Sequence, residues 1–247
     1  MGFLDRLRHD GLGWFELQVG SLELRVGTKA GAAGGLRDEA RIVAMHHWEQ
    51  LEAYVASNSA FQTSFVPLPV GNGAPPVVRA MGEAADAAGV GPMVTLPGAI
   101  AEAVARDLST HAREVIVTTE GDTYAVNGRA QTFVVDPGAG PERPGMGVRV
   151  PGGQPYAFYT SAGRSRLHPS IGHARVVAVL AEHGAVADAA ASAIGLAMMH
   201  PTHVERALLA TRRLEGQGLK GVLIVAGSTI GVWGSIEIVP APRPANC

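Results

Sequence analysis

Carboxylates set among very small residues are the groups of this sequence best suited to chemistry. Glu102 lies in the alanine-rich stretch 89–108, directly after a glycine-containing loop. A carboxylate held among small apolar residues can act as a base or a ligand, although its spacing of four from Arg106 equally fits a surface ion pair. Asp122 follows Gly121 just after an expected strand, where a tight turn also favours aspartate. Both carboxylates are therefore candidate catalytic residues, each with a structural alternative.

An aspartate and a serine share one face of a second small-residue helix. Asp188 lies within the expected helix 184–199, and Ser192 follows four residues later. A buried carboxylate needs a partner, and a hydroxyl one turn away can join it in binding a hard cation such as Mg²⁺. The alternative is a polar stripe that faces solvent on an amphipathic helix. The sequence leaves both readings open and makes these two residues the candidate metal ligands.

Positive charge gathers between residues 159 and 175 of an otherwise slightly acidic chain. Arginine there offers a two-pronged donor for a carboxylate or phosphate, and the hydroxyls of Thr160 and Ser161 could stabilise developing negative charge as catalytic groups. The alternative is a solvated basic loop. The candidate substrate-binding residues of this segment are Gly163, Arg164, Ser165, Arg166, His168 and His173.

Mixed helices and strands are expected to position these groups. Alternating polar and apolar residues predict a hairpin over 14–26, and the apolar spacing over 36–56 predicts a long helix. Thr202 and Glu205 fit a capping box that opens a further helix. The other expected elements are strands over 114–119 and 174–183, the two small-residue helices described above, and three short strands separated by glycines after residue 219.

Composition bounds the class of protein. The chain has 247 residues, and 20 Lys and Arg against 22 Asp and Glu, so it lacks the basic excess of a nucleic-acid binder. Its one cysteine, Cys247, allows no internal disulfide, and no apolar stretch is long enough to span a bilayer comfortably. We therefore expect a cytoplasmic protein, a single domain over 1–247, with no nucleic-acid or membrane partner. The sequence leaves open whether the protein forms a homo-oligomer.

Five motifs occur in the order and approximate spacing of a known family. They are AGVGPMVTLPGAIAEAVARDL, EVIVTTEGDTYAV, FYTSAGRS, GAVADAAASAIG and GVLIVAGSTIGVWGSIEI. Over most of its length the chain resembles the uncharacterised branch of the ApbE-like superfamily, uncharacterised-protein family 0280. The resemblance implies an α/β fold of the α+β type, with a mainly antiparallel sheet and packed helices in duplicated halves.

The named relatives in that superfamily are flavin transferases, which use Mg²⁺ and FAD to attach FMN to a protein threonine. Their metal site resembles Asp188 and Ser192, with serine in place of the usual threonine. Of the branch's Glu-Asn-Gly-Gly-Asp pattern, however, only Gly121 and Asp122 remain, and Tyr159 replaces the cysteine of a Cys-Thr-Ser-Ser-Gly pattern. These departures argue against flavin as a cofactor and leave Mg²⁺ open.

The branch is associated with sulfur assimilation, and our leading hypothesis joins this context to the basic segment. We expect an enzyme of the hydrolase or desulfhydrase type that removes sulfur, as sulfide, from an anionic, carboxylate-bearing thiocarbonyl compound. Water activated by Glu102, Asp122 or a metal at Asp188 would attack the carbon. The sulfur chemistry rests on analogy. The alternatives are a Mg²⁺-dependent flavin transferase and a non-catalytic anion-binding or sulfur-assimilation partner protein.

Overall fold

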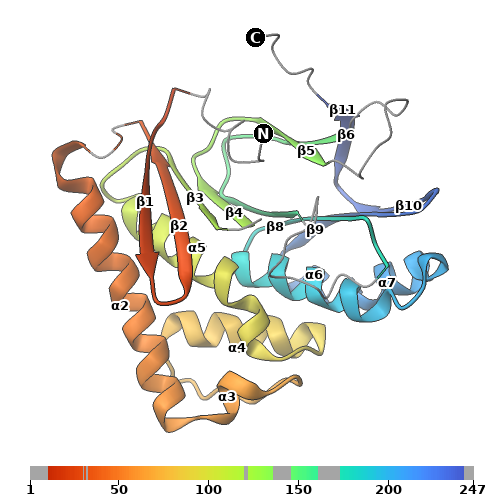
Figure 1. Cartoon of the computed structure of the whole chain (residues 1–247), viewed down its shortest axis with the longest axis horizontal. Helices are drawn as coiled ribbons and strands as arrows, with labels where there is room; N and C mark the ends of the chain where they lie inside the picture. Colours follow the sequence, from red (N-terminus) through yellow and green to blue (C-terminus); the bar gives the residue numbers. More distant parts are fainter. Residues whose placement is uncertain are drawn as a thin grey trace.

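Two sheets and a layer of helices make up the protein in the computed structural model, which describes residues 11–29, 31, 33–119, 122–135, 146–160 and 173–241 (Figure 1). All adjacent strands in both sheets are antiparallel. The larger sheet contains, in spatial order, β1 (Gly13–Val19), β2 (Leu22–Thr28), β3 (Val115–Thr119), β4 (Asp122–Val126), β7 (Tyr156–Thr160), β8 (Val176–Ala181), β9 (Leu219–Ala226) and β10 (Thr229–Gly234). The smaller sheet contains β11 (Glu237–Pro240), β6 (Met146–Val150) and β5 (Gln131–Val135).

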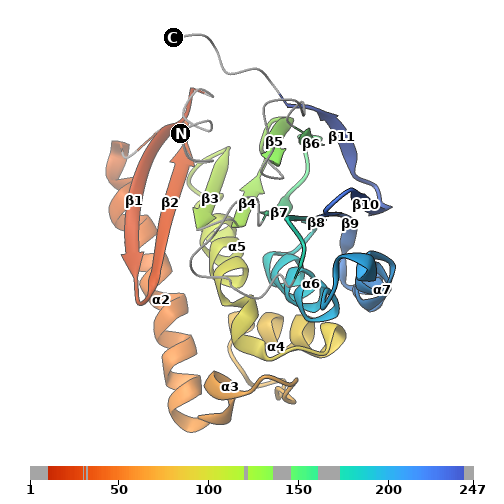
Figure 2. The same cartoon turned by 45° about the vertical axis from the view of Figure 1, so that its right-hand side comes forward.

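Helices cover one face of the larger sheet, and the smaller sheet covers the other (Figures 1 and 2). Each face has its own apolar core, because side chains alternate between the two faces of a strand. The helices are α2 (Leu36–Ser57), α3 (Ala60–Thr63), α4 (Pro76–Ala88), α5 (Leu96–Leu108), α6 (Gly184–Ala197) and α7 (Val204–Ala210), with 3₁₀ turns η2 (Ala33–Gly35), η3 (Pro92–Thr95), η4 (Pro201–His203) and η5 (Arg212–Gln217).

The larger sheet consists of two halves built to the same plan. In the first half, β1 and β2 lead through α2, α3, α4 and α5 into β3 and β4. In the second half, β7 and β8 lead through α6 and α7 into β9 and β10. Each half contributes four neighbouring strands to the sheet. This topology confirms the predicted antiparallel fold in duplicated halves.

The small residues of α5 and α6 allow the two helices to cross in close contact. A Cβ atom added to Gly98 would lie 2.4 Å from the carbonyl oxygen of Gly184, and one added to Gly184 would lie 2.0 Å from that of Gly98. Real Cβ atoms do not approach backbone oxygens so closely. The two helices therefore touch backbone to backbone at their first turns, which only glycine permits.

Most of the predicted elements are confirmed, and two local predictions are wrong. The loop expected from residue 159 onward begins later, because Tyr159 and Thr160 complete β7, consistent with the strand preference of aromatic and β-branched residues. Thr202 and Glu205 form no capping box. Instead, the Thr202 amide donates to Nδ1 of His200 at 3.3 Å, and the helix starts after a 3₁₀ turn.

The apolar helices α4, α5 and α6 belong to the core. Within the described part of the chain, no single helix has both the length and the apolarity needed to cross a membrane. Helix α4 and the segment Pro92–Leu108 meet that test only as a pair bent by 113°. Both contribute many buried side chains to the core beneath the larger sheet.

Candidate functional site

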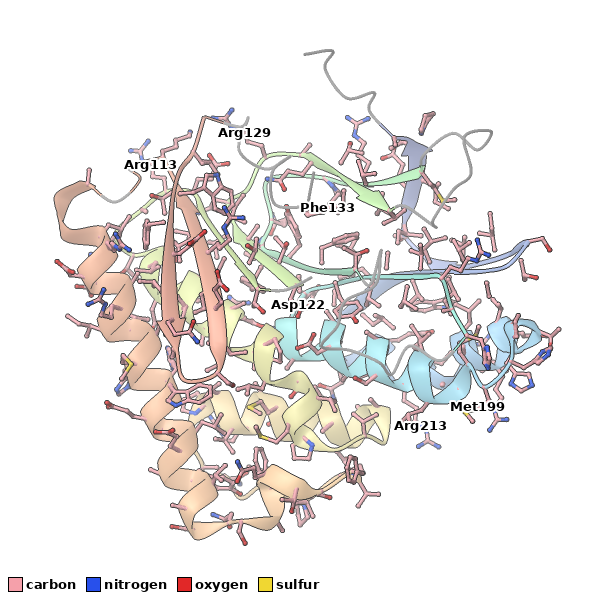
Figure 3. All side chains as sticks on the ribbon, in the orientation of Figure 1. Arg113, Asp122, Arg129, Phe133, Met199 and Arg213 are labelled. Carbon is pink, nitrogen blue, oxygen red and sulfur yellow. The ribbon has the colours of Figure 1, made fainter. Side chains whose placement is uncertain are left out.

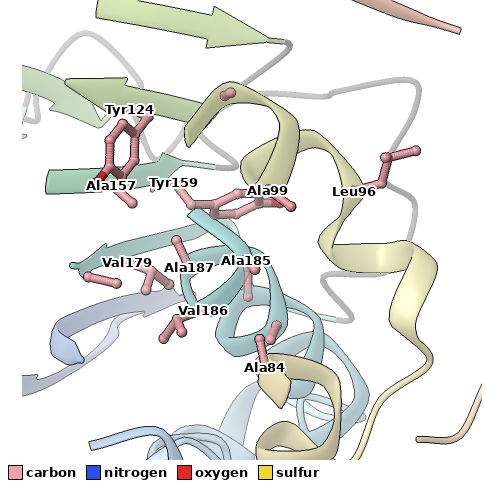
Figure 4. Close-up of a cluster of buried hydrophobic side chains, with 14 of the residues drawn as sticks. Ala84, Leu96, Ala99, Tyr124, Ala157, Tyr159, Val179, Ala185, Val186 and Ala187 are labelled. Atoms are coloured by element: carbon pink, nitrogen blue, oxygen red, sulfur yellow. The ribbon is translucent and has the colours of Figure 1, made fainter. Parts of the chain in front are cut away.

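Three buried polar side chains meet where the larger sheet contacts α6. Asp122 begins β4 and lies directly opposite Tyr159 of β7, so both point to the helix-covered face. Asp188 of α6 lies over this face, and its carboxyl group is hydrogen-bonded to that of Asp122. All three residues are at most 5% exposed. We call Asp122 and Asp188 the carboxylate pair. Figure 3 shows Asp122 near the start of α6, and Figure 4 shows Tyr159 among the alanines of α5 and α6.

Burial makes negative charge costly at this position. It raises the pKa of Asp188, although hydrogen bonds from Asp122 and the Gly98 amide act in the opposite direction. Burial also raises the pKa of the Tyr159 phenol, and the charges of the two aspartates add to this effect. Two adjacent carboxyl groups that are buried together need either a shared proton or a cation between them.

A small cavity adjoins the carboxylate pair. Its volume is about 10 Å³, which is the space of one water molecule or one metal ion. A larger molecule would have to lie outside it. The cavity is lined by residues from both helices and two strands: Gly98, Ala101, Asp122, Thr123, Tyr124, Ala157, Phe158, Gly184 and Ala187.

A carboxylate on the second turn of each of the helices α5 and α6 caps the first turn of the other helix. Oδ2 of Asp188 accepts a hydrogen bond from the Gly98 amide of α5 at 2.7 Å, and Oε2 of Glu102 accepts one from the Gly184 amide of α6 at 2.7 Å. The residues preceding these helices provide no side-chain cap in the described structure. The first amides of a helix need acceptors, and carboxylates there also complement the helix dipole. We call these two hydrogen bonds the crossed caps.

The other oxygen of Glu102 is also engaged. Oε1 accepts hydrogen bonds from Nε of Arg106 at 2.7 Å and Nδ1 of His183 at 2.9 Å. Burial raises the pKa of Glu102, but the hydrogen bonds from His183, Gly184 and Arg106 outweigh burial and hold the pKa below its ordinary value. Glu102 is therefore an ionised carboxylate, and both of its oxygens accept hydrogen bonds where α5 and α6 cross. Its predicted role as a catalytic base stays a prediction.

The contact between Glu102 and His183 predicts a pH-dependent stability. The hydrogen bond to Glu102 raises the pKa of His183 above 6.5, so its stabilising effect is complete below pH 6.5 and is lost as the pH rises through the raised value. The lowered pKa of Glu102 gives stability that is present above pH 4.5 and is lost as the pH falls through the lowered value.

We therefore expect urea unfolding to show that wild type loses more stability than His183→Gln between about pH 6 and about pH 8. The difference will be small, because the His183 side chain is 48% exposed. Equal losses in the two proteins would contradict this assignment.

The structure brings only some of the predicted site residues together. Asp122 and Asp188 meet, and Ser192 lies one turn further along α6, partly exposed. Thr160 is buried beside Tyr159 in β7, but strand alternation points it to the opposite face of the sheet from Asp122.

The remaining candidates lie elsewhere or outside the described residues. The amide of His173 donates to the carbonyl of Met198 at 2.8 Å, beyond the last turn of α6. Met198 follows Asp188 by ten positions, which corresponds to about 15 Å along a helix axis. His173 is thus held away from the carboxylate pair. The predicted residues outside the described ranges are Ser161, Gly163, Arg164, Ser165, Arg166 and His168.

Sequence reasoning missed two contributors to the site. Tyr159 was considered only as a replacement for cysteine, and its position beside Asp122 depends on the register between β4 and β7. Gly98 was seen only as a small residue, whereas its amide holds Asp188. The signal for Gly98 was present in the sequence, because an amide near the start of a helix needs an acceptor.

The fold is similar to that of solved flavin transferases. The flavin transferase ApbE from Vibrio cholerae aligns with a TM-score of 0.57 and 13% identity, over 91% of this chain and 97% of that one. The apo form of the Pseudomonas stutzeri flavinyl transferase ApbE aligns with a TM-score of 0.55 and 13% identity, over 90% and 94%. At this identity the likeness establishes the fold.

These neighbours correct the functional hypothesis drawn from the sequence. Both are transferases, so the proposed hydrolase or desulfhydrase class and the release of sulfide are wrong as the leading interpretation. That hypothesis came from the metabolic context of the branch and from a basic segment, neither of which specifies a reaction. The expectation against flavin also loses its support, because both neighbours are named for flavin transfer.

Relatives in sequence define the family more closely. The UPF0280 protein of Methanosarcina acetivorans is 32% identical over 192 residues, which cover 77% of this chain and 75% of that protein. The UPF0280 protein MJ1526 of Methanocaldococcus jannaschii is 29% identical over 235 residues, covering 93% and 95%. A family described as AbpE bacteria matches residues 5–225. The chain therefore belongs to this ApbE-like family, together with the UPF0280 proteins of methanogenic archaea.

Proposed function

We propose that this protein is a Mg²⁺-dependent transferase that moves FMN from FAD to a hydroxyl group of an acceptor. The carboxylate pair beside a water-sized cavity is the observation that carries the proposal. The similarity of the whole fold to flavin transferases supports the flavin substrate. The family resemblance supports a threonine as the acceptor.

The carboxylate pair fits a magnesium ion, because Asp122 lines the cavity and Asp188 is hydrogen-bonded to Asp122. Asp122 and Asp188 offer carboxylate oxygens, which Mg²⁺ prefers, and a divalent cation would balance two buried negative charges. Ser192 is a further candidate ligand through its hydroxyl group. Mg²⁺ usually keeps several waters and takes one or two carboxylates together with substrate phosphates, so two aspartates are a sufficient protein contribution.

The starts of α5 and α6 lie beside the same cavity, because Gly98 and Gly184 line it. The carboxylates of Asp188 and Glu102 already cap these helix ends, so a bound cation is the group that would attract an anionic substrate here. A diphosphate such as that of FAD would lie outside the small cavity. Mg²⁺, when bound, would supply charge neutralisation for the diphosphate and for the departing phosphate.

The proposed reaction is a phosphoryl-type substitution. The acceptor hydroxyl oxygen forms a bond to the phosphorus of the FMN part, and the bond from that phosphorus to the bridging oxygen breaks. AMP leaves with the electron pair of the broken bond. Asp122 lies at the cavity wall and has two carboxylate oxygens, so we propose that one binds the cation and the other accepts the proton of the attacking hydroxyl.

We expect FAD to stabilise the protein only when Mg²⁺ is present. At FAD concentrations about 100 times the Kd, ligand binding adds about 2.7 kcal/mol, which raises the Tm of a chain of this size by about 5 °C or more. AMP should appear on chromatography in proportion to the FMN attached to a threonine-containing peptide, and EDTA should prevent both effects. No Tm shift and no AMP with Mg²⁺ would contradict the proposal.

A further inference from the structure

Glu102 does not belong to the carboxylate pair, but it binds the start of α6, the helix that carries Asp188. We infer that Glu102 is a positioning residue: by capping α6 it fixes the place at which Asp188 faces Asp122 and a bound cation. This inference rests on the cation site of the proposed function and is independent of the flavin chemistry.

The crossed caps form two parallel bridges between the helices. Gly98 and Glu102 are four residues apart on α5, and Gly184 and Asp188 are four residues apart on α6. Residues at this spacing lie one above the other on the same face of a helix. One bridge joins Gly98 to Asp188, and the other joins Glu102 to Gly184, both at 2.7 Å.

This arrangement leaves little freedom at the crossing. The backbones already touch at Gly98 and Gly184, so α6 cannot move closer to α5. The two bridges prevent it from moving away or rotating. If the bridge from Glu102 is removed, the hydrogen bond that remains between these two helix starts is the one that Asp188 accepts, and Asp188 is the residue that would bind the cation. Any resulting shift of Gly184 is carried to Asp188 along one turn of helix.

Glu102 is itself fixed in the orientation that this role requires. Its side chain is only 13% exposed, and Arg106 and His183 both bind the oxygen that does not cap α6. Arg106 is held in turn above the ring of Tyr124, with its guanidinium carbon 5.3 Å from the ring centre. Partners that hydrogen-bond directly to a metal ligand typically change metal affinity by about 10- to 100-fold when they are lost, and Glu102 acts on Asp188 from one helical turn away, so we place its effect at the lower end of that range.

A second carboxylate of α5 provides a matched control. Asp107 also binds a histidine, because its Oδ2 lies 2.9 Å from Nε2 of His47. This pair links α5 to α2, on the side away from α6, and the Asp107 side chain is 50% exposed. Asp107→Ala therefore removes a carboxylate–histidine contact from the same helix and leaves the crossed caps intact.

The test is a titration of the full-length protein with Mn²⁺, followed by electron paramagnetic resonance and repeated in competition with Mg²⁺. We expect Glu102→Ala to weaken Mn²⁺ binding by about tenfold or more, and Glu102→Gln by a smaller factor, because glutamine still offers an oxygen to the Gly184 amide. Asp107→Ala should bind Mn²⁺ as wild type does. Hydrogen exchange should show faster exchange at the start of α6 in Glu102→Ala only.

The outcomes separate this inference from the proposed function. If Glu102→Ala and Glu102→Gln bind Mn²⁺ as tightly as wild type, the positioning role is overturned and flavin transfer is unaffected. If the affinities differ as expected but wild type forms no AMP from FAD, the positioning role stands and flavin transfer fails. If wild type binds neither metal, both are wrong. Should Glu102→Ala fail to fold, Glu102→Gln decides: unchanged affinity overturns the inference.

Discussion

Asp188→Asn is expected to weaken Mg²⁺ binding and slow FMN transfer by about 100-fold or more, while leaving the protein at least as stable as wild type. Asparagine keeps a side-chain oxygen for the Gly98 amide and offers its NH₂ group to Asp122. It also removes one of two adjacent buried carboxyl groups, whose desolvation opposes folding. A cation, in contrast, loses one of its two carboxylate ligands, so we expect affinity to fall by about 100-fold or more.

Asp188→Ala is the control that separates these effects. Alanine cannot accept the hydrogen bond from Gly98, so α5 loses its cap, at a cost of about 1 to 2 kcal/mol. In urea unfolding without metal, Asp188→Asn should therefore have a free energy of unfolding equal to or higher than that of wild type. Asp188→Ala should have a lower one. Wild-type affinity for Mn²⁺ in Asp188→Asn would show that Asp188 is not a ligand. A large loss of stability in the same variant would show that the pair is held by an attraction we have not identified.

Gly184→Ala is expected to be among the most destabilising single substitutions in the chain. The added Cβ would lie 2.0 Å from the carbonyl oxygen and 2.5 Å from the carbonyl carbon of Gly98. Both are backbone atoms, which cannot rotate away as a side chain can. Overpacking usually costs about 1 to 3 kcal/mol, and a clash between two helix backbones belongs at or above the upper end. We expect a Tm lower by about 6 °C or more.

Gly216→Ala is the matched control for this substitution. Among the described residues no atom lies within 4 Å of a Cβ added there, and its φ is not among the positive values. Alanine should change stability by less than about 1 kcal/mol in either direction. Differential scanning calorimetry of the two variants makes the comparison. Equal Tm values for Gly184→Ala and Gly216→Ala would mean that α5 and α6 do not cross in backbone contact.

The elements that the sequence predicts well are those with a strong local pattern. The hairpin of β1 and β2, the long helix α2 and the three closing strands each follow from periodicity and glycine spacing within a few residues. The loop expected from Tyr159 onward was placed too early, because polar residues at the end of a buried strand look locally like the start of a loop.

The site was predicted as separate residues and not as an arrangement. Asp122 and Asp188 were both singled out, but they lie 66 positions apart, and only the order of strands and helices brings them together. Glu102 stands out in the sequence as a carboxylate among small residues, and its predicted catalytic role stays a prediction. Its partner, the Gly184 amide, lies 82 positions away, so its contact with α6 is not readable from the sequence.

Inferences about function differ according to whether they came from particular residues or from metabolic context. Asp188 and Ser192 stay predicted ligands of a hard cation, whereas the expected sulfur chemistry came from context and was wrong. The basic segment between residues 159 and 175 lies mainly outside the described residues, so its arginines stay predicted substrate ligands. Whether they bind the phosphates of FAD is a question for the same assay that tests the reaction.

Release of AMP from FAD by wild type and Asp188→Asn, measured side by side with and without Mg²⁺, tests the central claim most directly. The account predicts AMP from wild type with Mg²⁺, none after EDTA, and a rate lower by about 100-fold or more in a folded Asp188→Asn protein. Equal AMP release by the two proteins, or none by wild type with Mg²⁺ and a threonine acceptor, would contradict a Mg²⁺-dependent FMN transferase at the carboxylate pair.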